Sequence, residues 1–375
     1  MPLRIIRNNI TEVSADALVN TANPKVQIGS GTDKAVYKAA GMDKLFSMRK
    51  KIGNIEPGNV AVTRAFRLKA KYIIHAVSPV WQGGDSHEEE LLRACYMKSM
   101  EEAGKRHCAS IAIPLLGSGS NGFPKETALR IALDAIQSFL MDHDMEVILV
   151  VFDKDSFALS SRVFKDVASY IQDHQVEELK AVEYARRREN RQINFREEIQ
   201  FPQAQALSVL NENDDIWNDD FRDEGVREEP APVQMPQAKE SRPRPVHHAV
   251  RPEFVPQKPD KFMPKEETFQ VKLLKLIDAS GETDPDVYKR ANIDRKLFAK
   301  IRKNENYKPS KKTAIALALA LRLSLPEACD LLSRAGFALS YSTTFDLIIR
   351  YCFENREYNI FDVNAILFQF DQETL

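Results

Sequence analysis

Short apolar runs alternate with amphipathic stretches over residues 1–171. The runs are rich in valine, isoleucine, leucine and alanine, as expected of strands that are covered on both faces. Strands are predicted over residues 3–6, 17–20, 59–63, 72–76, 110–114 and 146–152, and helices over residues 33–40, 87–103, 125–141 and 157–170. This alternation predicts an α/β fold over residues 1–172, in which three layers are built around a mixed, largely parallel sheet.

The hydrophobic pattern is lost between residues 173 and 266. Residues 212–229 carry nine acids against two arginines, and nine prolines follow between residues 230 and 264. Proline lacks an amide donor and disfavours helix in the residue before it. Because so polar a stretch cannot bury a core, a disordered linker is predicted over residues 173–266.

Helical periodicity returns after residue 266. Phe269, Leu273, Leu274 and Ile277 mark one face of a helix. Further helices are predicted over residues 285–291, 294–303, 310–321, 325–335, 343–354 and 360–368. Since no strand-like alternation interrupts them, residues 267–375 are predicted to form a separate all-α domain. Its apolar last third either closes the core of that domain or mediates dimerisation.

Composition adds few constraints. The chain has 375 residues and a net charge of −1, which allows two or three domains and indicates no charged partner. None of the four cysteines forms a CxxC pair or lies near a histidine at ligand spacing, so neither a disulfide framework nor a metal site is predicted. The chain start lacks the apolar core of a signal peptide, and no apolar run approaches the ~18 residues of a membrane span. A cytoplasmic protein with no membrane partner is expected.

Two glycine-rich segments, residues 29–33 and 117–122, lie between a predicted strand and a predicted helix. Glycine lets the backbone approach a ligand closely, successive amides form an anion-binding concavity, and a following helix adds its positive N-terminal end. The alternative is that each segment is only a tight turn, because one such motif is weak by itself. Two of them favour a diphosphate held between them at the carboxyl ends of the strands.

Five segments of the chain together resemble the macrodomain family. They are residues 16–23 (DALVNTAN), 29–33 (GSGTD), 39–41 (AAG), 72–79 (YIIHAVSP) and 117–124 (GSGSNGFP). The resemblance implies a macrodomain fold and ADP-ribose binding. In many members it also implies hydrolysis of ADP-ribosyl bonds on proteins, nucleic acids or acetylated ADP-ribose. No cofactor is then required, and ADP-ribose is the ligand or the product.

The resemblance also assigns roles to individual residues. Asn23 would orient the distal ribose, and Asp33 would position or activate a water near the anomeric carbon, a task that suits a carboxylate. Asp33 also fits the first turn of a helix, where acids are favoured, and both roles can hold together. The ligand-binding residues would be Asn9, Ile10, Gly29, Gly31, Gly117, Ser118, Gly119, Ser120, Asn121, Gly122 and Phe152. Of these, Phe152 would pack on the adenine or, alternatively, serve as an ordinary core aromatic.

Two positions depart from the family pattern. Asn9 stands where the family has an acid that recognises the adenine amino group, and its side-chain oxygen is expected to accept that hydrogen bond without charge assistance. Asn121 stands where the family has an aromatic against the distal ribose. Both changes favour altered ligand recognition. His75, within an apolar strand, is expected to be a core residue.

Residues 268–337 look like a repressor-type helix-turn-helix fold. Asn292 suits a left-handed helix end and Asp294 a helix N-cap. Between residues 287 and 312, ten lysines and arginines stand against two acids, which is either a nucleic-acid footprint or a surface that is solvated or docks a protein. The nucleic-acid contacts would be Arg290, Arg295, Lys296 and Lys300.

Three functions therefore remain open. The first is an ADP-ribosyl hydrolase that is targeted to ADP-ribosylated protein or nucleic acid by its helical tail. The second is a non-catalytic sensor or reader of an ADP-ribose-type nucleotide. The third is a regulator or antitoxin-like protein in which the tail binds DNA or a protein partner.

Overall fold

The computed structural model describes residues 2–152, 157, 159–160, 162–174 and 267–375. The predicted linker lies outside these residues from 175 onward. Residues 162–174 are helical.

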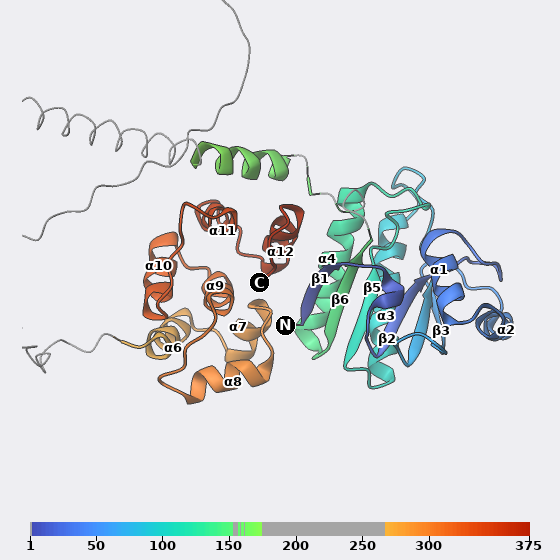
Figure 1. The fold of residues 1–375 in the computed structure, drawn as a ribbon, viewed down its shortest axis with the longest axis horizontal. Coiled ribbons are helices and arrows are strands. Elements are labelled where there is room, and N and C mark those ends of the chain that lie inside the picture. The colour runs from blue at the N-terminus through green and yellow to red at the C-terminus, as the bar shows by residue number, and fades with distance from the viewer. Residues whose placement is uncertain (1, 153–156, 158, 161, 175–266) are drawn as a thin grey trace, which may run out of the picture. The chain divides into compact units, whose positions relative to one another are not determined.

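A six-stranded sheet forms the centre of the first region (Figure 1). Its order is β1-β6-β5-β2-β4-β3, with β3 antiparallel to β4 and every other pair parallel. The strands are β1 (Leu3–Arg7), β2 (Ala17–Thr21), β3 (Val60–Arg64), β4 (Tyr72–Ala76), β5 (Ser110–Pro114) and β6 (Glu146–Val151). The mixed, largely parallel sheet predicted from the sequence is confirmed.

Helices cover both faces of this sheet, as the apolar strands require. The elements are η1 (Ile10–Glu12), α1 (Gly31–Ala40), α2 (Met42–Ile52), α3 (Glu88–Lys105) and α4 (Lys125–Asp142). Leu18 and Ile73 share one core with Tyr37 and Leu45 of α1 and α2. The opposite strand faces pack with α3 and α4. The sequence pattern predicted neither η1 nor α2, because α2 buries only Leu45 and Arg49.

The C-terminal region is helical throughout its described residues. Its helices are α6 (Phe269–Ser280), α7 (Asp284–Arg290), α8 (Arg295–Lys303), α9 (Lys311–Ala320), α10 (Leu325–Arg334), α11 (Thr344–Glu354) and α12 (Ile360–Gln369). The apolar α9 lies at the centre, with all residues from Ala314 to Ala320 buried. Asn292 has a positive φ of 53° and Asp294 accepts from the Leu297 amide, as predicted. The apolar end of the chain closes this core, since Ile348, Ile349 and Leu367 are fully buried.

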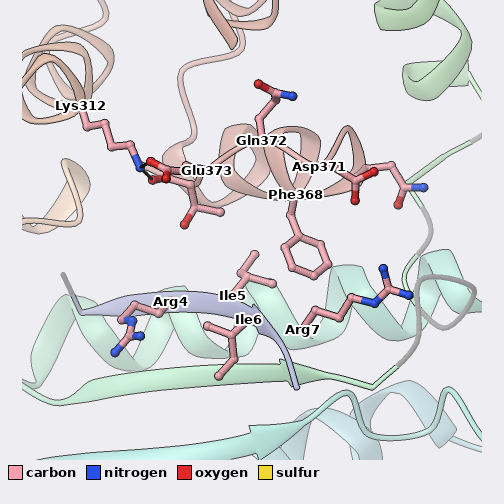
Figure 2. A pocket seen from close by; sticks show the side chains of 11 residues that line it. Arg4, Ile5, Ile6, Arg7, Lys312, Phe368, Asp371, Gln372 and Glu373 are labelled. Atoms are coloured by element: carbon pink, nitrogen blue, oxygen red, sulfur yellow. Dashed lines mark hydrogen bonds and ion pairs between the residues drawn. The ribbon is translucent and has the colours of Figure 1, made fainter. Parts of the chain in front are cut away.

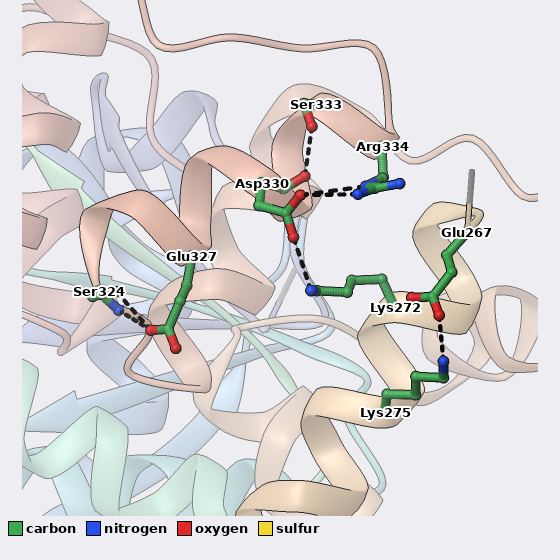
Figure 3. Close-up of polar contacts among 8 residues, drawn as sticks. All are labelled: Glu267, Lys272, Lys275, Ser324, Glu327, Asp330, Ser333 and Arg334. Carbon is green, nitrogen blue, oxygen red and sulfur yellow. Dashed lines mark hydrogen bonds and ion pairs between the residues drawn. The ribbon is translucent and has the colours of Figure 1, made fainter. Parts of the chain in front are cut away.

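Ion pairs and caps fix α6 against α10 (Figure 3). The Lys272 ammonium lies 2.8 Å from the Asp330 carboxylate, which also pairs with Arg334 on its own helix. Glu327 accepts from both the backbone and the hydroxyl of Ser324 and completes a capping box at the start of α10. These pairs, whose side chains are partly exposed, orient the helices, and each contributes only about 0–1 kcal/mol of stability.

The helical region packs against the sandwich beside β1 and α4. α7 and α12 contact α4, and α12 also contacts the edge strand β1. A cavity of about 600 Å³ lies between β1 and residues 368–374 (Figure 2). Two charged side chains on its wall are paired, Arg4 with Glu146 and Lys312 with Glu373. In the described part of the chain, no helix is both long and apolar enough to cross a bilayer.

Candidate functional site

A cavity of about 720 Å³ opens at the carboxyl ends of the parallel strands. This is the edge at which open α/β sheets bind ligands. Most of the residues proposed from the sequence line it: Asn9, Ile10, Asn23, Gly29, Gly31, Asp33, Gly117, Ser118, Gly119, Ser120, Asn121 and Phe152. Gly122 is not among the lining residues. The folding of separate loops onto one sheet edge therefore brings nearly the whole set together.

The strand order sets the order of chemical groups along the cavity. Asn9 and Phe152 follow the neighbouring strands β1 and β6, whereas the glycine-rich segment 117–121 follows β5. Asn23 follows β2, and Asp33 lies in the first turn of α1. From one end to the other, the cavity thus presents an aromatic ring, a run of amides and a carboxylate.

The amides of residues 117–121 form the middle of the cavity. Within the described residues, none of these five amides donates to a protein acceptor, whereas the next two bond back to the loop, Gly122 to Gly119 and Phe123 to Gly117. Asp33 is the only charged residue among the described ones that line the cavity. The site therefore offers backbone donors to an anion rather than lysine or arginine side chains.

The glycines of this loop serve different purposes. Gly117 has a φ of +81°, and a Cβ there would lie 3.0 Å from the Phe123 ring, so the fold itself requires glycine. Gly119 has no such constraint, since a Cβ there would meet nothing within 4 Å. A side chain at Gly119, which lines the cavity, would therefore extend into open space.

Asn121 joins this loop to the segment after β4. Its Nδ2 donates to the carbonyl oxygen of Ser78 at 3.0 Å and to the Ser78 hydroxyl at 2.7 Å. Its own carbonyl accepts from the Trp81 amide at 2.8 Å. Asn121 thus fixes the two cavity walls to each other, a role that sequence reasoning did not assign.

Asp33 is buried, with 2% of its surface exposed. Its Oδ1 accepts from Asn20 Nδ2 and its Oδ2 from the Gly29 amide, both at 2.6 Å. Burial raises the pKa of Asp33, while the bonds from Asn20 and Gly29 and the charge of Arg49 act in the opposite direction. The carboxylate is therefore held by a donor on each oxygen, beside the cavity.

A chain of buried polar groups lies behind Asp33. Asn20 Nδ2 also lies 3.2 Å from His75 Nδ1, and His75 Nε2 lies 3.0 Å from the Thr63 hydroxyl. Burial lowers the pKa of His75 to about 3, so the ring is neutral. His75 is fully buried, as expected, but it is also a hydrogen-bonded neighbour of the Asp33 support.

Arg49 fixes the loop that carries Asn23. Its guanidinium donates to the Asn23 carbonyl at 3.2 Å and to the carbonyl of Gly53. The Asn23 side-chain oxygen accepts from the Lys25 amide at 3.0 Å. Sequence reasoning missed Arg49 and Asn20, although a polar residue within the apolar strand at 17–20 was a signal for the latter.

Comparisons with known proteins agree with this geometry. Residues 19–132 match the family model described as "Macro domain". A macro domain-containing protein of Caldanaerobacter subterraneus is 36% identical over 169 residues, which are 44% of this chain and 97% of that protein. The chain belongs to the macrodomain family.

Other relatives carry more specific names. A macro domain-containing protein of Methanosarcina mazei is 40% identical over 156 residues, 41% of this chain and 83% of the relative. A protein of Citrobacter rodentium named O-acetyl-ADP-ribose deacetylase is 35% identical over 166 residues, 43% of this chain and 94% of the relative. A solved structure of the Oceanobacillus iheyensis macrodomain with ADP is 31% identical and aligns with 41% of this chain and 85% of that one, at a TM-score of 0.40.

The structure defines the surroundings of two predicted residues of this macrodomain site, Asn9 and Phe152. The Asn9 side-chain oxygen accepts from the Thr11 amide at 3.1 Å and from the Thr11 hydroxyl at 2.9 Å. Both lone pairs of that oxygen are used here, so the predicted hydrogen bond from a base would have to share or displace one of these contacts. Phe152 is 71% exposed, so the alternative that it is a core aromatic is wrong.

The four residues predicted to contact nucleic acid differ in exposure and in ion pairing. Arg295, Lys296 and Lys300 of α8 are exposed and make no ion pair with any residue that the structure describes. Arg290, by contrast, is paired with Glu282. The expectation that Arg290 contacts nucleic acid is therefore not favoured, because its charge is already compensated within the domain.

Proposed function

We propose that this macrodomain binds ADP-ribose or an ADP-ribosyl group extended along the sheet edge. The base would lie beside Phe152, the diphosphate against the amides of residues 117–121, and the distal ribose beside Asn23 and Asp33. The observation that carries this proposal is the run of five amides without a protein acceptor, because unpaired backbone donors at a cavity wall suit an anion. The uncapped start of α1 at Ser30 adds its positive end to the same cavity.

The same geometry supports hydrolysis. Asp33 is a buried carboxylate whose two oxygens each accept one hydrogen bond and so retain a second acceptor site each. It can position or activate a water for attack beside the distal ribose, with Asn23 orienting that ribose. The name of the Citrobacter rodentium relative, an O-acetyl-ADP-ribose deacetylase, supports hydrolytic chemistry at this site. The proposed reaction class is hydrolysis of an acyl or glycosidic bond to ADP-ribose.

The test is turnover by the full chain. We expect release of ADP-ribose from mono-ADP-ribosylated protein, mono-ADP-ribosylated nucleic acid or O-acetyl-ADP-ribose. Asp33→Ala should lower the rate ~10²–10⁴-fold, the usual contribution of a general acid or base, while binding measured by calorimetry changes much less. Asp43→Ala, an exposed acid in the first turn of α2, is the matched control.

Two results would overturn the enzymatic proposal. Full turnover by Asp33→Ala would assign the chemistry to another group. If the wild-type protein binds ADP-ribose tightly but releases nothing from any of the three substrates, the domain is a reader of ADP-ribosyl groups rather than a hydrolase.

A second candidate function concerns the helical tail. We infer that α8 is the nucleic-acid-contacting helix of a helix-turn-helix domain, because Arg295, Lys296 and Lys300 are exposed on it without an ion-pair partner among the described residues. Unpaired cations on one helix suit the phosphates of a nucleic acid. The tail would then bring the macrodomain to DNA or RNA.

Nucleic-acid binding by the full chain tests this function. The double change Arg295→Ala and Lys296→Ala should weaken binding and reduce the salt dependence by ~1 for each lost phosphate contact. The double change Lys44→Ala and Lys51→Ala removes two exposed cations from α2 and should alter neither. If the wild-type chain has no affinity for DNA or RNA at low salt, the surface of α8 instead docks a protein or is simply solvated.

A further inference from the structure

Asn9 directs one defined end of its side-chain amide away from its own backbone. The Thr11 backbone N–H can only donate, so the atom 3.1 Å from it is the Asn9 oxygen. The Thr11 hydroxyl, 2.9 Å away, uses the second lone pair of that oxygen. The remaining end is the Nδ2 amino group, which has no acceptor among the described residues.

Asn9 lies at the same end of the cavity as an exposed aromatic residue, Phe152. The Asn8 amide donates to the Val151 carbonyl at 3.1 Å, and Arg7 is in register with Val151, so the residues after β1 and β6 are neighbours. Asn9 and Phe152 both line the cavity, and Phe152 is 71% exposed. An aromatic face beside a directional polar group is the combination that proteins use to stack and read a nucleobase.

We propose that Asn9 sets the base specificity of this subsite by presenting a hydrogen-bond donor, which favours a 6-oxopurine over adenine. A 6-oxopurine has two acceptors on its N7 edge, whereas adenine has one acceptor and an amino donor there. Opposite Asn9, the adenine amino group would place donor against donor. This inference rests on the proposed binding of an ADP-ribose-type ligand and names the base that the ligand carries.

An aspartate at this position would reverse the preference. One carboxylate oxygen could still accept from Thr11, so the local fold would be retained. The other oxygen would then accept from an adenine amino group, with charge assistance. Asn9→Asp is therefore a nearly isosteric exchange of a donor for an acceptor at the base.

The experiment compares two ligands that differ only in the base, ADP-ribose and inosine diphosphate ribose. Calorimetry is performed on the full chain of the wild type, Asn9→Asp and Asn8→Asp. Asn8 also lines the cavity, and its side-chain oxygen already accepts from the Asn9 amide at 2.8 Å. Asn8→Asp thus adds the same charge at the same end of the cavity without reversing the donor at Asn9.

The wild type is expected to bind inosine diphosphate ribose at least as tightly as ADP-ribose. Asn9→Asp should shift the affinity ratio toward ADP-ribose about tenfold, as one hydrogen bond to a charged group would, while Asn8→Asp weakens both ligands alike. A tenfold wild-type preference for ADP-ribose, or an unchanged ratio in Asn9→Asp, would overturn this inference and leave the proposed function standing. If neither ligand binds the wild type at millimolar concentration, the proposed function fails together with it.

Discussion

Asp33 is oriented by a chain of neutral hydrogen-bonding groups. Asn20 uses its Nδ2 for both Asp33 and His75. His75 can accept at Nδ1 only if its proton is on Nε2, and the Thr63 hydroxyl lies at that nitrogen. The ionised Asp33 carboxylate can only accept, so Asn20 presents its Nδ2 to it. The same Nδ2 donates to His75 Nδ1, which places the His75 proton on Nε2, where the Thr63 hydroxyl accepts it.

The first prediction is a pH dependence of hydrolysis. Burial raises the pKa of Asp33 above its ordinary value of 3.8. If the ionised carboxylate is the active form, kcat/KM should fall as the pH decreases through this raised pKa. The Asn20 hydrogen bond lowers the Asp33 pKa, so Asn20→Ala should move the acidic limb to higher pH. A pH–rate profile measures both effects, and an unmoved limb in Asn20→Ala would show that another group titrates there.

The second prediction isolates the acceptor at His75. His75→Asn can place its side-chain oxygen near the position of Nδ1, whereas His75→Phe keeps a ring but has no acceptor. We expect His75→Phe to lower kcat about tenfold, roughly the value of one misoriented hydrogen bond. His75→Asn should retain more activity, and KM should change less than kcat. Equal losses in two variants of equal stability would mean that His75 serves only packing.

At the scale of elements, the loop between β5 and α4 has to turn the chain and also hold its backbone amides in place for a ligand. Gly117 and Gly122 turn the chain through positive φ values of 81° and 73°. Ser118 closes the first turn by donating from its hydroxyl to the Leu115 carbonyl at 2.8 Å. These local constraints hold the amides of residues 117–121 in place, so that the loop is preorganised before any ligand arrives.

The third prediction concerns this loop. Gly119→Glu should abolish ADP-ribose binding, with Kd raised at least ~100-fold, because a carboxylate would repel the diphosphate. The fold should be retained, since a Cβ at this position meets nothing within 4 Å. Gly119→Gln has the same size without the charge and should bind more tightly than Gly119→Glu. Calorimetry with a thermal unfolding control measures this, and unchanged affinity in folded Gly119→Glu would exclude the loop as the phosphate cradle.

At the scale of the whole described structure, the helical region is packed against the sheet edge. Asn292 accepts from the Leu3 amide at 2.7 Å and donates to the Leu3 carbonyl at 2.9 Å, and so occupies backbone groups of the edge strand. Asn359 donates to Gln137 of α4 at 3.0 Å. One continuous apolar core extends from the sheet through α3 and α4 into the helical region. Covering an edge strand in this way also protects it from pairing with another chain.

The fourth prediction tests this contact. Asn292→Ala should lower the free energy of unfolding by about 1–3 kcal/mol, because the buried Leu3 backbone groups lose their partner. Asn292→Gly loses the same bonds but keeps the positive φ of 53° without strain. The difference in unfolding free energy between Asn292→Ala and Asn292→Gly therefore measures the strain of a positive φ at alanine. The loss that remains in Asn292→Gly measures the hydrogen bonds to Leu3. Urea unfolding of the full chain measures both, and wild-type stability of Asn292→Gly would show that the contact contributes nothing.

The sequence by itself determined the strands, most of the helices and the glycine-rich loops of the site. The strands at 72–76 and 110–114 were predicted with the bounds that the structure has, because the strand period and the turn residues are local properties. The glycine-rich segments identified the cavity for the same reason. The helix α2 escaped prediction, since it buries only two side chains and one of them is the charged Arg49.

Only the tertiary structure decided what each side chain does. The sequence cannot show that the Asn9 oxygen is taken by Thr11, that Phe152 is exposed, or that Asn20 connects His75 to Asp33. Nor does it show that Asn292 reaches Leu3, 289 positions away. Hydrogen bonds are directional and short, so whether a polar group is still available to a ligand depends on neighbours that the fold brings together from distant parts of the chain.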